Sequence, residues 1–105
     1  MKRDFEAEIT DEHAQWIVSC TYDAAKCSLV INLSSTLDVL KSERTIEFSG
    51  VDKLKYRWSQ RNRTDVEGLL GGHESEEHGC YRYLLVTDQR EIQLTTHLPA
   101  VVRAA

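Results

Sequence analysis

Two runs of alternating apolar and polar residues, separated by a polar turn, lie between Cys80 and Thr96. Their period of two is typical of β-strands, and the turn Thr87–Arg90 contains neither Gly nor Asn. A four-residue loop built on a type I turn is therefore favoured over a two-residue type I′ turn. This loop pairs Val86 with Glu91 and Leu85 with Ile92. One face then carries the large side chains, and the other carries Arg82, Leu84, Val86, Glu91, Gln93 and Thr95.

The same alternation predicts further strands along the chain. We expect a short strand at 5–9, a hairpin of 16–22 and 27–33, a long strand at 45–58, a short one at 65–72 and an edge strand at 98–102. In the first hairpin, the loop 23–26 places Cys20 opposite Leu29 and Cys27 opposite Tyr22. Gly50 interrupts the alternation of the long strand, which predicts a bend or bulge that lets it serve two parts of a curved sheet.

Two segments are predicted to lack strands. Residues 73–79 contain no apolar side chain and are expected to form a solvated loop. In residues 33–42, Leu33, Leu37 and Leu40 fit a helical period, but Ser and Thr crowd the start, so one helical turn or an ordered loop is expected.

We therefore predict a mainly β fold in one domain, residues 1–105. It would be a single antiparallel sheet meander of about six or seven strands with at most one short helix. To bury one apolar face per strand, the sheet must roll into a barrel-like structure or stack as a two-layer sandwich. The chain of 105 residues, 41% hydrophobic and 29% charged, is large enough for one core.

The start of the chain and the use of cysteine favour a cytoplasmic location. Acidic residues follow Lys2 and Arg3, where a signal peptide needs an uncharged apolar run, and there is no run of 18 apolar residues. Three cysteines, Cys20, Cys27 and Cys80, cannot form a closed disulfide framework, so reduced thiols packed in the core are expected. No membrane partner is predicted.

The segments 13–33 and 44–56 resemble small bacterial β proteins, namely YxiG-like proteins and some immunity proteins of polymorphic toxin systems. The shared elements are a strand that ends in Tyr22-Asp23 and the pattern L-x-F-x-x-V-x-x-L, here I-E-F-S-G-V-D-K-L from Ile46 to Leu54. The segment Asp11-Glu12-His13-Ala14 departs from the F-H-D-A of those proteins. The resemblance implies a partner-binding role without catalysis.

Few residues of the sequence could take part in catalysis or metal binding. The run H-E-S-E-E-H-G-C from His73 to Cys80 contains metal-ligand types, but their spacing matches no tetrahedral zinc site, so an acidic solvated loop is favoured. A thiol nucleophile needs a neighbouring histidine, and only Cys80 with His78 or His97 offers one. We expect packing there, and we predict no catalytic residue, metal or cofactor.

The charge distribution is more informative. Residues 51–63 contain five basic residues and one acid, whereas residues 64–79 contain five acids and no Lys or Arg. We predict that the basic strip is a binding surface; it consists of Lys53, Lys55, Arg57, Arg61 and Arg63. The alternative is a solvated strand face that discourages edge pairing.

The sequence thus favours a non-enzymatic interaction domain that contacts a protein partner through this strip or a sheet edge. Three alternatives stay open: an immunity-type protein that neutralises a bacterial toxin, a nucleic-acid-binding module, and a Cys/His metal or thiol enzyme. Nucleic acid is not favoured, because Tyr56 and Trp58 alternate away from the strip and leave no stacking platform on it.

Overall fold

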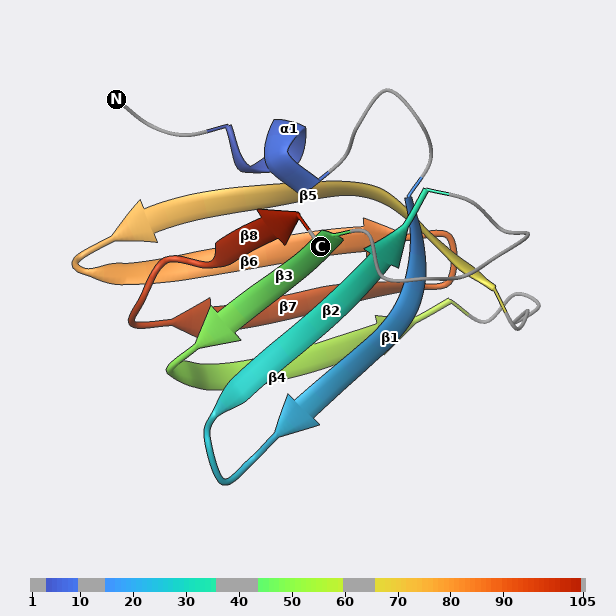
Figure 1. The fold of residues 1–105 in the computed structure, drawn as a ribbon. Coiled ribbons are helices and arrows are strands. Elements are labelled where there is room, and N and C mark those ends of the chain that lie inside the picture. The colour runs from blue at the N-terminus through green and yellow to red at the C-terminus, as the bar shows by residue number, and fades with distance from the viewer. Residues whose placement is uncertain (1–3, 10–14, 36–43, 60–65, 105) are drawn as a thin grey trace.

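The computed structural model describes residues 4–9, 15–35, 44–59 and 66–104. It contains one short helix and eight strands (Figure 1). Their bounds are α1 Phe5–Ile9, β1 Gln15–Asp23, β2 Ser28–Ser34, β3 Arg44–Ser49, β4 Val51–Trp58, β5 Glu67–Glu77, β6 Cys80–Thr87, β7 Arg90–Thr96 and β8 Val101–Ala104.

All eight strands form one antiparallel sheet in the order β4-β7-β6-β5-β1-β2-β3-β8. The mainly β prediction with one sheet and one short helix is confirmed, but the strand count is eight rather than six or seven. The sheet is not a meander, because β1 pairs with β5, β7 with β4 and β3 with β8. It is also not closed into a barrel, since β4 and β8 remain its two ends.

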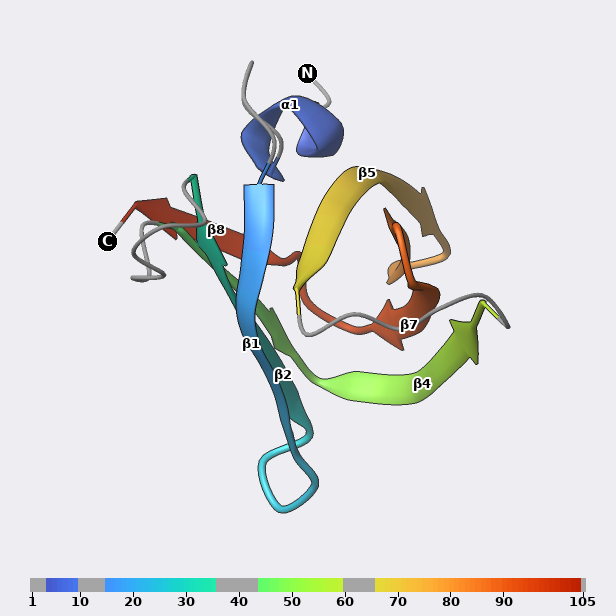
Figure 2. The same cartoon turned by 90° about the vertical axis from the view of Figure 1, so that its right-hand side faces the viewer.

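Gly50 explains how the open sheet still encloses a core. It lies between β3 and β4 at φ 67°, a conformation that favours glycine. Because β3 lies near one end of the sheet and β4 is the other end, the bend brings the two ends of the sheet together. The strands β4 and β5 curve away from the flatter layer of β1, β2, β3 and β8 (Figure 2). The predicted bend in the long strand is confirmed.

The hairpin of β6 and β7 has the predicted register. Val86 pairs with Glu91, Leu85 with Ile92 and Tyr83 with Leu94. The inward side chains of these last two pairs are buried, at 3% exposure or less. The alternation of large side chains on one face therefore determined the pairing.

The register predicted for the first hairpin is wrong. Tyr22 pairs with Leu29, and Cys20 pairs with Ile31 rather than Leu29. The turn occupies 24–27 because the Asp23 carboxylate accepts hydrogen bonds from the N–H groups of Ala25 and Lys26, which starts the turn one residue later. Cys27 consequently lies in the turn, exposed and at φ 49°, and not in the core.

A bulge in β1 changes which residues face inward. The pairing with β2 shifts between Ile17 and Ser19. Ile17 and Cys20 therefore both pack against the core, although they differ in parity. The strict alternation expected for residues 16–22 does not hold across this point.

Residues 5–9 form the helix α1 instead of the predicted strand. The Asp4 side chain accepts a hydrogen bond from the Ala7 N–H at 3.1 Å, as an N-terminal cap does. Phe5 and Ile9, one turn apart, are both buried. They pack over Gly72 of β5, where a Cβ atom would overlap the Ile9 side chain.

The predicted loop 73–79 is mostly strand. β5 continues to Glu77, which pairs with Cys80, so only His78 and Gly79 form the turn. Both residues have positive φ, at 53° and 79°, as a two-residue type I′ hairpin turn requires. The absence of apolar residues reflects exposure of this end of the hairpin, and not the absence of a strand.

Two predicted segments remain: the edge strand at 98–102, and the segment 33–42, for which one helical turn or an ordered loop was expected. The edge strand exists, but it begins at Val101, after Pro99, and pairs with β3. In the segment 33–42, Leu33 and Ser34 belong to β2, and residues 36–43 lie outside the described part of the chain.

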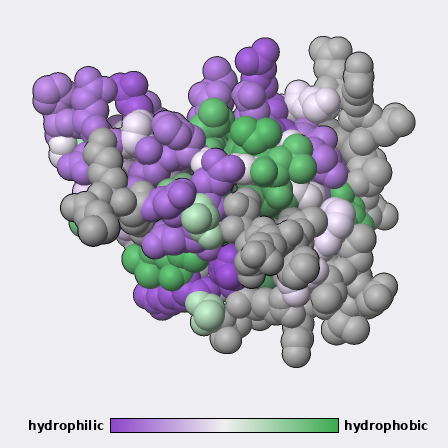
Figure 3. Space-filling model, turned by 90° about the horizontal axis from the view of Figure 1, so that it is seen from above, coloured by the Kyte–Doolittle hydropathy of each residue, from purple (hydrophilic) through white to green (hydrophobic). Residues whose placement is uncertain are grey.

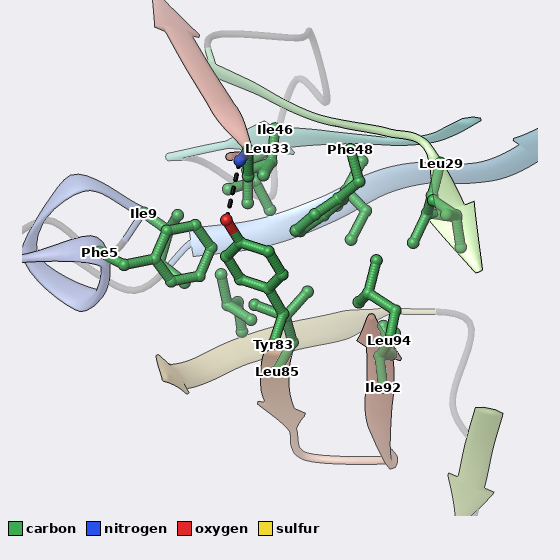
Figure 4. Close-up of a cluster of buried hydrophobic side chains, with 14 residues drawn as sticks. Phe5, Ile9, Leu29, Leu33, Ile46, Phe48, Tyr83, Leu85, Ile92 and Leu94 are labelled. Carbon is green, nitrogen blue, oxygen red and sulfur yellow. Dashed lines mark hydrogen bonds between the residues drawn. The ribbon is translucent and has the colours of Figure 1, made fainter. Parts of the chain in front are cut away.

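The core lies between the two halves of the sheet. Leu29, Ile31, Leu33, Ile46 and Phe48 come from one half and Tyr83, Leu85, Ile92 and Leu94 from the other (Figure 4). The Tyr83 ring is 5.0 Å from the rings of both Phe5 and Phe48, and its hydroxyl accepts a hydrogen bond from the Ala100 N–H. Seen from above, the described surface is mostly hydrophilic, with smaller hydrophobic areas (Figure 3).

Candidate functional site

The outer face of β4, β7, β6 and β5 carries the candidate site. Strand pairing aligns its outward side chains in successive rows across the four strands. From β5 to β4 these rows are Ser75, Arg82, Thr95 and Lys53, then His73, Leu84, Gln93 and Lys55, and then Gly71, Val86, Glu91 and Arg57. We call these positions the outer face.

The first two rows line a hollow of about 470 Å³, which we call the basic hollow. Its lining consists of Lys53, Lys55, His73, Ser75, Arg82, Tyr83, Leu84, Gln93, Leu94 and Thr95. Three of these side chains are permanent cations, several others can donate hydrogen bonds, and none is an Asp or Glu. The hollow is therefore chemically suited to carboxylate or phosphate oxygens.

The structure brings together part of the predicted basic strip. Lys53, Lys55 and Arg57 are exposed on β4, as the alternation predicts, and the first two line the basic hollow. Arg61 and Arg63 lie outside the described residues. The strip as a binding surface stays a prediction.

Eight of the ten residues that line the basic hollow were not predicted as site residues, among them Arg82, His73 and Ser75. Arg82 reaches the lysines through two strand pairings, because it lies opposite Thr95, which lies opposite Lys53. The sequence could have predicted this position, because the hairpin register already places Arg82 on the outward face. His73 and Ser75 were assigned to a loop, and no sequence signal placed them beside Lys55 and Lys53.

A second hollow of about 480 Å³ continues the outer face toward the turn between β6 and β7. Arg57, Trp58, Leu70, Val86 and Glu91 are among the residues that line it. Leu70 is 64% exposed and Trp58 is 39% exposed, so two large apolar side chains are accessible among the polar residues of this second hollow. Arg57 and Glu91 are register partners and place opposite charges side by side.

A partly buried cluster of polar and aromatic side chains lies on the inner side of the sheet, where Cys20 of β1 contacts Tyr56 of β4. Arg90 forms a bidentate ion pair with Glu67, and its guanidinium lies 4.8 Å from the centre of the Tyr56 ring and 4.6 Å from that of Trp58. The Cys20 Sγ is 3.8 Å from the Tyr56 hydroxyl. The contact between Cys20 and Tyr56 joins β1 to the edge strand β4, with which it shares no strand pairing.

Burial sets the protonation states in this cluster. Loss of solvent raises the pKa of the Cys20 thiol above its ordinary value, and it outweighs the opposing charge of Arg90. Burial, with Cys20 as the next cause, raises the pKa of Tyr56 to about 12. Both groups are therefore neutral at pH 7, and Cys20 lacks the thiolate that nucleophilic chemistry needs.

A second thiol has a different environment. The Sγ of Cys80 is 3.9 Å from Nδ1 of His97, and this contact is open to solvent. The pairing was considered from the sequence, and the hairpin register produces it, because Tyr81 pairs with Thr96 and the next positions are Cys80 and His97. A thiol and an imidazole at this distance can share a proton.

The other proposed ligands of the run 73–80 are dispersed. His73 lines the basic hollow, whereas His78 occupies the exposed turn beside Glu77. Among the described residues, no three His, Cys, Asp or Glu side chains come together as a metal site would require.

Comparison of the chain with protein-family models, curated proteins and solved structures finds no match. The resemblance to YxiG-like and immunity proteins therefore stays a prediction. In the described part of the chain, no helix has the length and apolar character needed to cross a membrane.

Proposed function

We propose that this protein is a non-catalytic binding domain whose outer face holds an acidic segment of a partner protein. The observation that carries the proposal is the basic hollow, where Lys53, Lys55 and Arg82 meet without a carboxylate in the lining. Opposite charge on a partner would raise the association rate and select among partners.

The rest of the outer face favours a protein over a nucleic acid. Leu84 lies between the cations, and Val86 and the exposed Leu70 extend an apolar path toward the second hollow. Single-stranded nucleic acids bind by stacking their bases on aromatic rings. Tyr83 of β6 is buried in the core, and the Trp58 ring already carries the Arg90 guanidinium.

The test uses a fluorescently labelled deca-glutamate peptide and measures its anisotropy on titration with the protein at low salt. We expect K53E/K55E to weaken binding by about tenfold or more, because it places like charges against the peptide. The matched control is K26E, which reverses an exposed lysine in the turn between β1 and β2 that is not part of the lining of the basic hollow.

Two outcomes would overturn the proposal. One is equal loss of affinity in K26E and K53E/K55E, which would indicate net charge instead of a site. The other is tighter binding of a ten-residue oligothymidylate than of the peptide, with the same dependence on Lys53 and Lys55. That result would assign the surface to nucleic acid.

A further inference from the structure

The outer face continues one row beyond the basic hollow. Tyr81 and Thr96 are the last pair of β6 and β7, and the side chains of the positions that follow, Cys80 and His97, are in contact. Cys80 lies two residues from Arg82 on the same face of β6, a separation of about 7 Å along the strand. Arg82 and Lys53 belong to the adjoining row.

This row combines a nucleophile, a base and neighbouring cations. The Cys80 Sγ and the His97 Nδ1 are 3.9 Å apart at the surface. The backbone N–H of His97 donates a hydrogen bond to the Gly50 carbonyl, which fixes the histidine at the end of β7. The three cations of the basic hollow, Lys53, Lys55 and Arg82, outnumber the single carboxylate of Glu77, the register partner of Cys80 on β5, and attract anions toward the thiol.

We propose that Cys80 is a site of mixed-disulfide formation with anionic disulfides of the glutathione type. His97 takes the thiol proton, and the Cys80 sulfur attacks one sulfur of the disulfide. The new S–S bond forms as the old one breaks, and the leaving thiolate takes the proton from His97. The Cys80 sulfur is oxidised and the departing sulfur is reduced, so the step balances without another oxidant. The carboxylates of the reagent bind Arg82 and Lys53.

The other two cysteines provide internal references. Cys27 is more exposed than Cys80, but its sulfur lies 3.7 Å from the Ala24 carbonyl and not beside a histidine of the described residues. Cys20 is partly buried beside Tyr56, and burial raises its pKa. Reactivity that follows exposure alone would therefore favour Cys27.

The experiment exposes the reduced protein to glutathione disulfide, an anion, or to cystamine, a cation of similar chemistry. Peptide mass spectrometry gives the modification rate of each cysteine. We expect Cys80 to react with glutathione disulfide about tenfold faster than Cys27. K53Q/R82Q should slow that reaction about fivefold without slowing cystamine. H97Q should lower the rate of Cys80 with both reagents, and K26Q should leave both of these rates unchanged.

Equal rates at Cys80 and Cys27 would overturn the proposal, as would an equal effect of K53Q/R82Q on both reagents. The proposal does not depend on the acidic partner. If K53E/K55E loses deca-glutamate binding but Cys80 reacts no faster than Cys27, the partner site stands and the thiol site is refuted. If Cys80 reacts faster but K53E/K55E binds deca-glutamate normally, the thiol site stands and the partner site is refuted. Circular dichroism of each variant confirms that the fold is retained.

Discussion

Arg90 and Glu67 join two strands that are not neighbours in the sheet. Arg90 begins β7 and Glu67 begins β5, with β6 between them. The Arg90 Nε and Nη2 donate hydrogen bonds of 2.8 and 2.9 Å to the two carboxylate oxygens, and Thr87 of β6 donates a third at 2.6 Å. Burial alone would lower the pKa of Arg90, but the hydrogen bonds and charge of Glu67 reverse the shift. The pair therefore stays ionised.

Breaking this pair should destabilise the fold strongly. The Arg90 and Glu67 side chains are only 9% and 12% exposed, so either charge left alone would be largely without solvent. We expect E67L and R90M each to lower the free energy of unfolding by about 3 kcal/mol. The double variant should be more stable than either single one, because no unpaired charge remains. Urea denaturation followed by circular dichroism measures the free energy of unfolding of the three variants. A loss below about 1 kcal/mol in the single variants would indicate a solvent-screened pair.

Two adjacent glycines of β5 should respond differently to alanine. A Cβ at Gly72 would overlap Ile9 Cδ1 and lie 3.0 Å from Leu85 Cδ2, whereas one at Gly71 would meet only the Glu6 carboxyl group, at 3.7 Å. We expect G72A to cost about 1–3 kcal/mol by overpacking under α1, and G71A to cost less than 1 kcal/mol. Thermal unfolding compares them. In the G72A background, I9V removes the clashing methyl group and should recover part of the loss; equal effects of G71A and G72A would contradict the packing of α1.

The same contact explains why α1 was not predicted. Phe5, Ala7 and Ile9 alternate as a strand would, but Phe5 and Ile9 also lie one helical turn apart. The choice depends on Gly72, far away in the chain, whose missing side chain leaves room for a helix. By contrast, the register of the hairpin of β6 and β7 could be predicted, because shifting it by one residue would expose its large side chains.

The candidate site was predictable only where alternation identified an exposed strand face. Lys53 and Lys55 follow from that pattern, and Arg82 follows from the hairpin register. Ser75 was missed because the second half of β5 contains polar residues on both faces. There the inward position belongs to Glu74, which accepts a hydrogen bond from Tyr83 at 2.5 Å in place of apolar packing. A strand of this kind is specified by its partner and not by its own hydrophobicity.

The turn between β5 and β6 provides a stabilising substitution. His78 adopts φ 53° and Gly79 φ 79°, which are left-handed conformations. Asn-Gly is the preferred pair for a type I′ turn, so H78N should raise the free energy of unfolding by about 0.5 kcal/mol. G79A should lower it by about 1 kcal/mol, because alanine disfavours positive φ. Chemical denaturation distinguishes these results, and a neutral G79A would be inconsistent with the two-residue turn.

The Tyr56 hydroxyl should make stability fall in alkaline solution. Burial raises the pKa of Tyr56 from 10.0 to about 12, so above pH 10 the unfolded chain releases this proton before the folded chain does. The unfolded state then binds fewer protons than the native state, and stability decreases as the pH rises from 10 to 12. Y56F keeps the ring beneath Arg90 but has no proton to release, so its free energy of unfolding should decline less over this range. Urea denaturation at a series of pH values measures the two slopes, and the difference in phenolate absorbance between wild type and Y56F locates the titration directly. Identical slopes, or phenolate formation near pH 10, would mean that Tyr56 is solvated and that the contact between β1 and β4 is open.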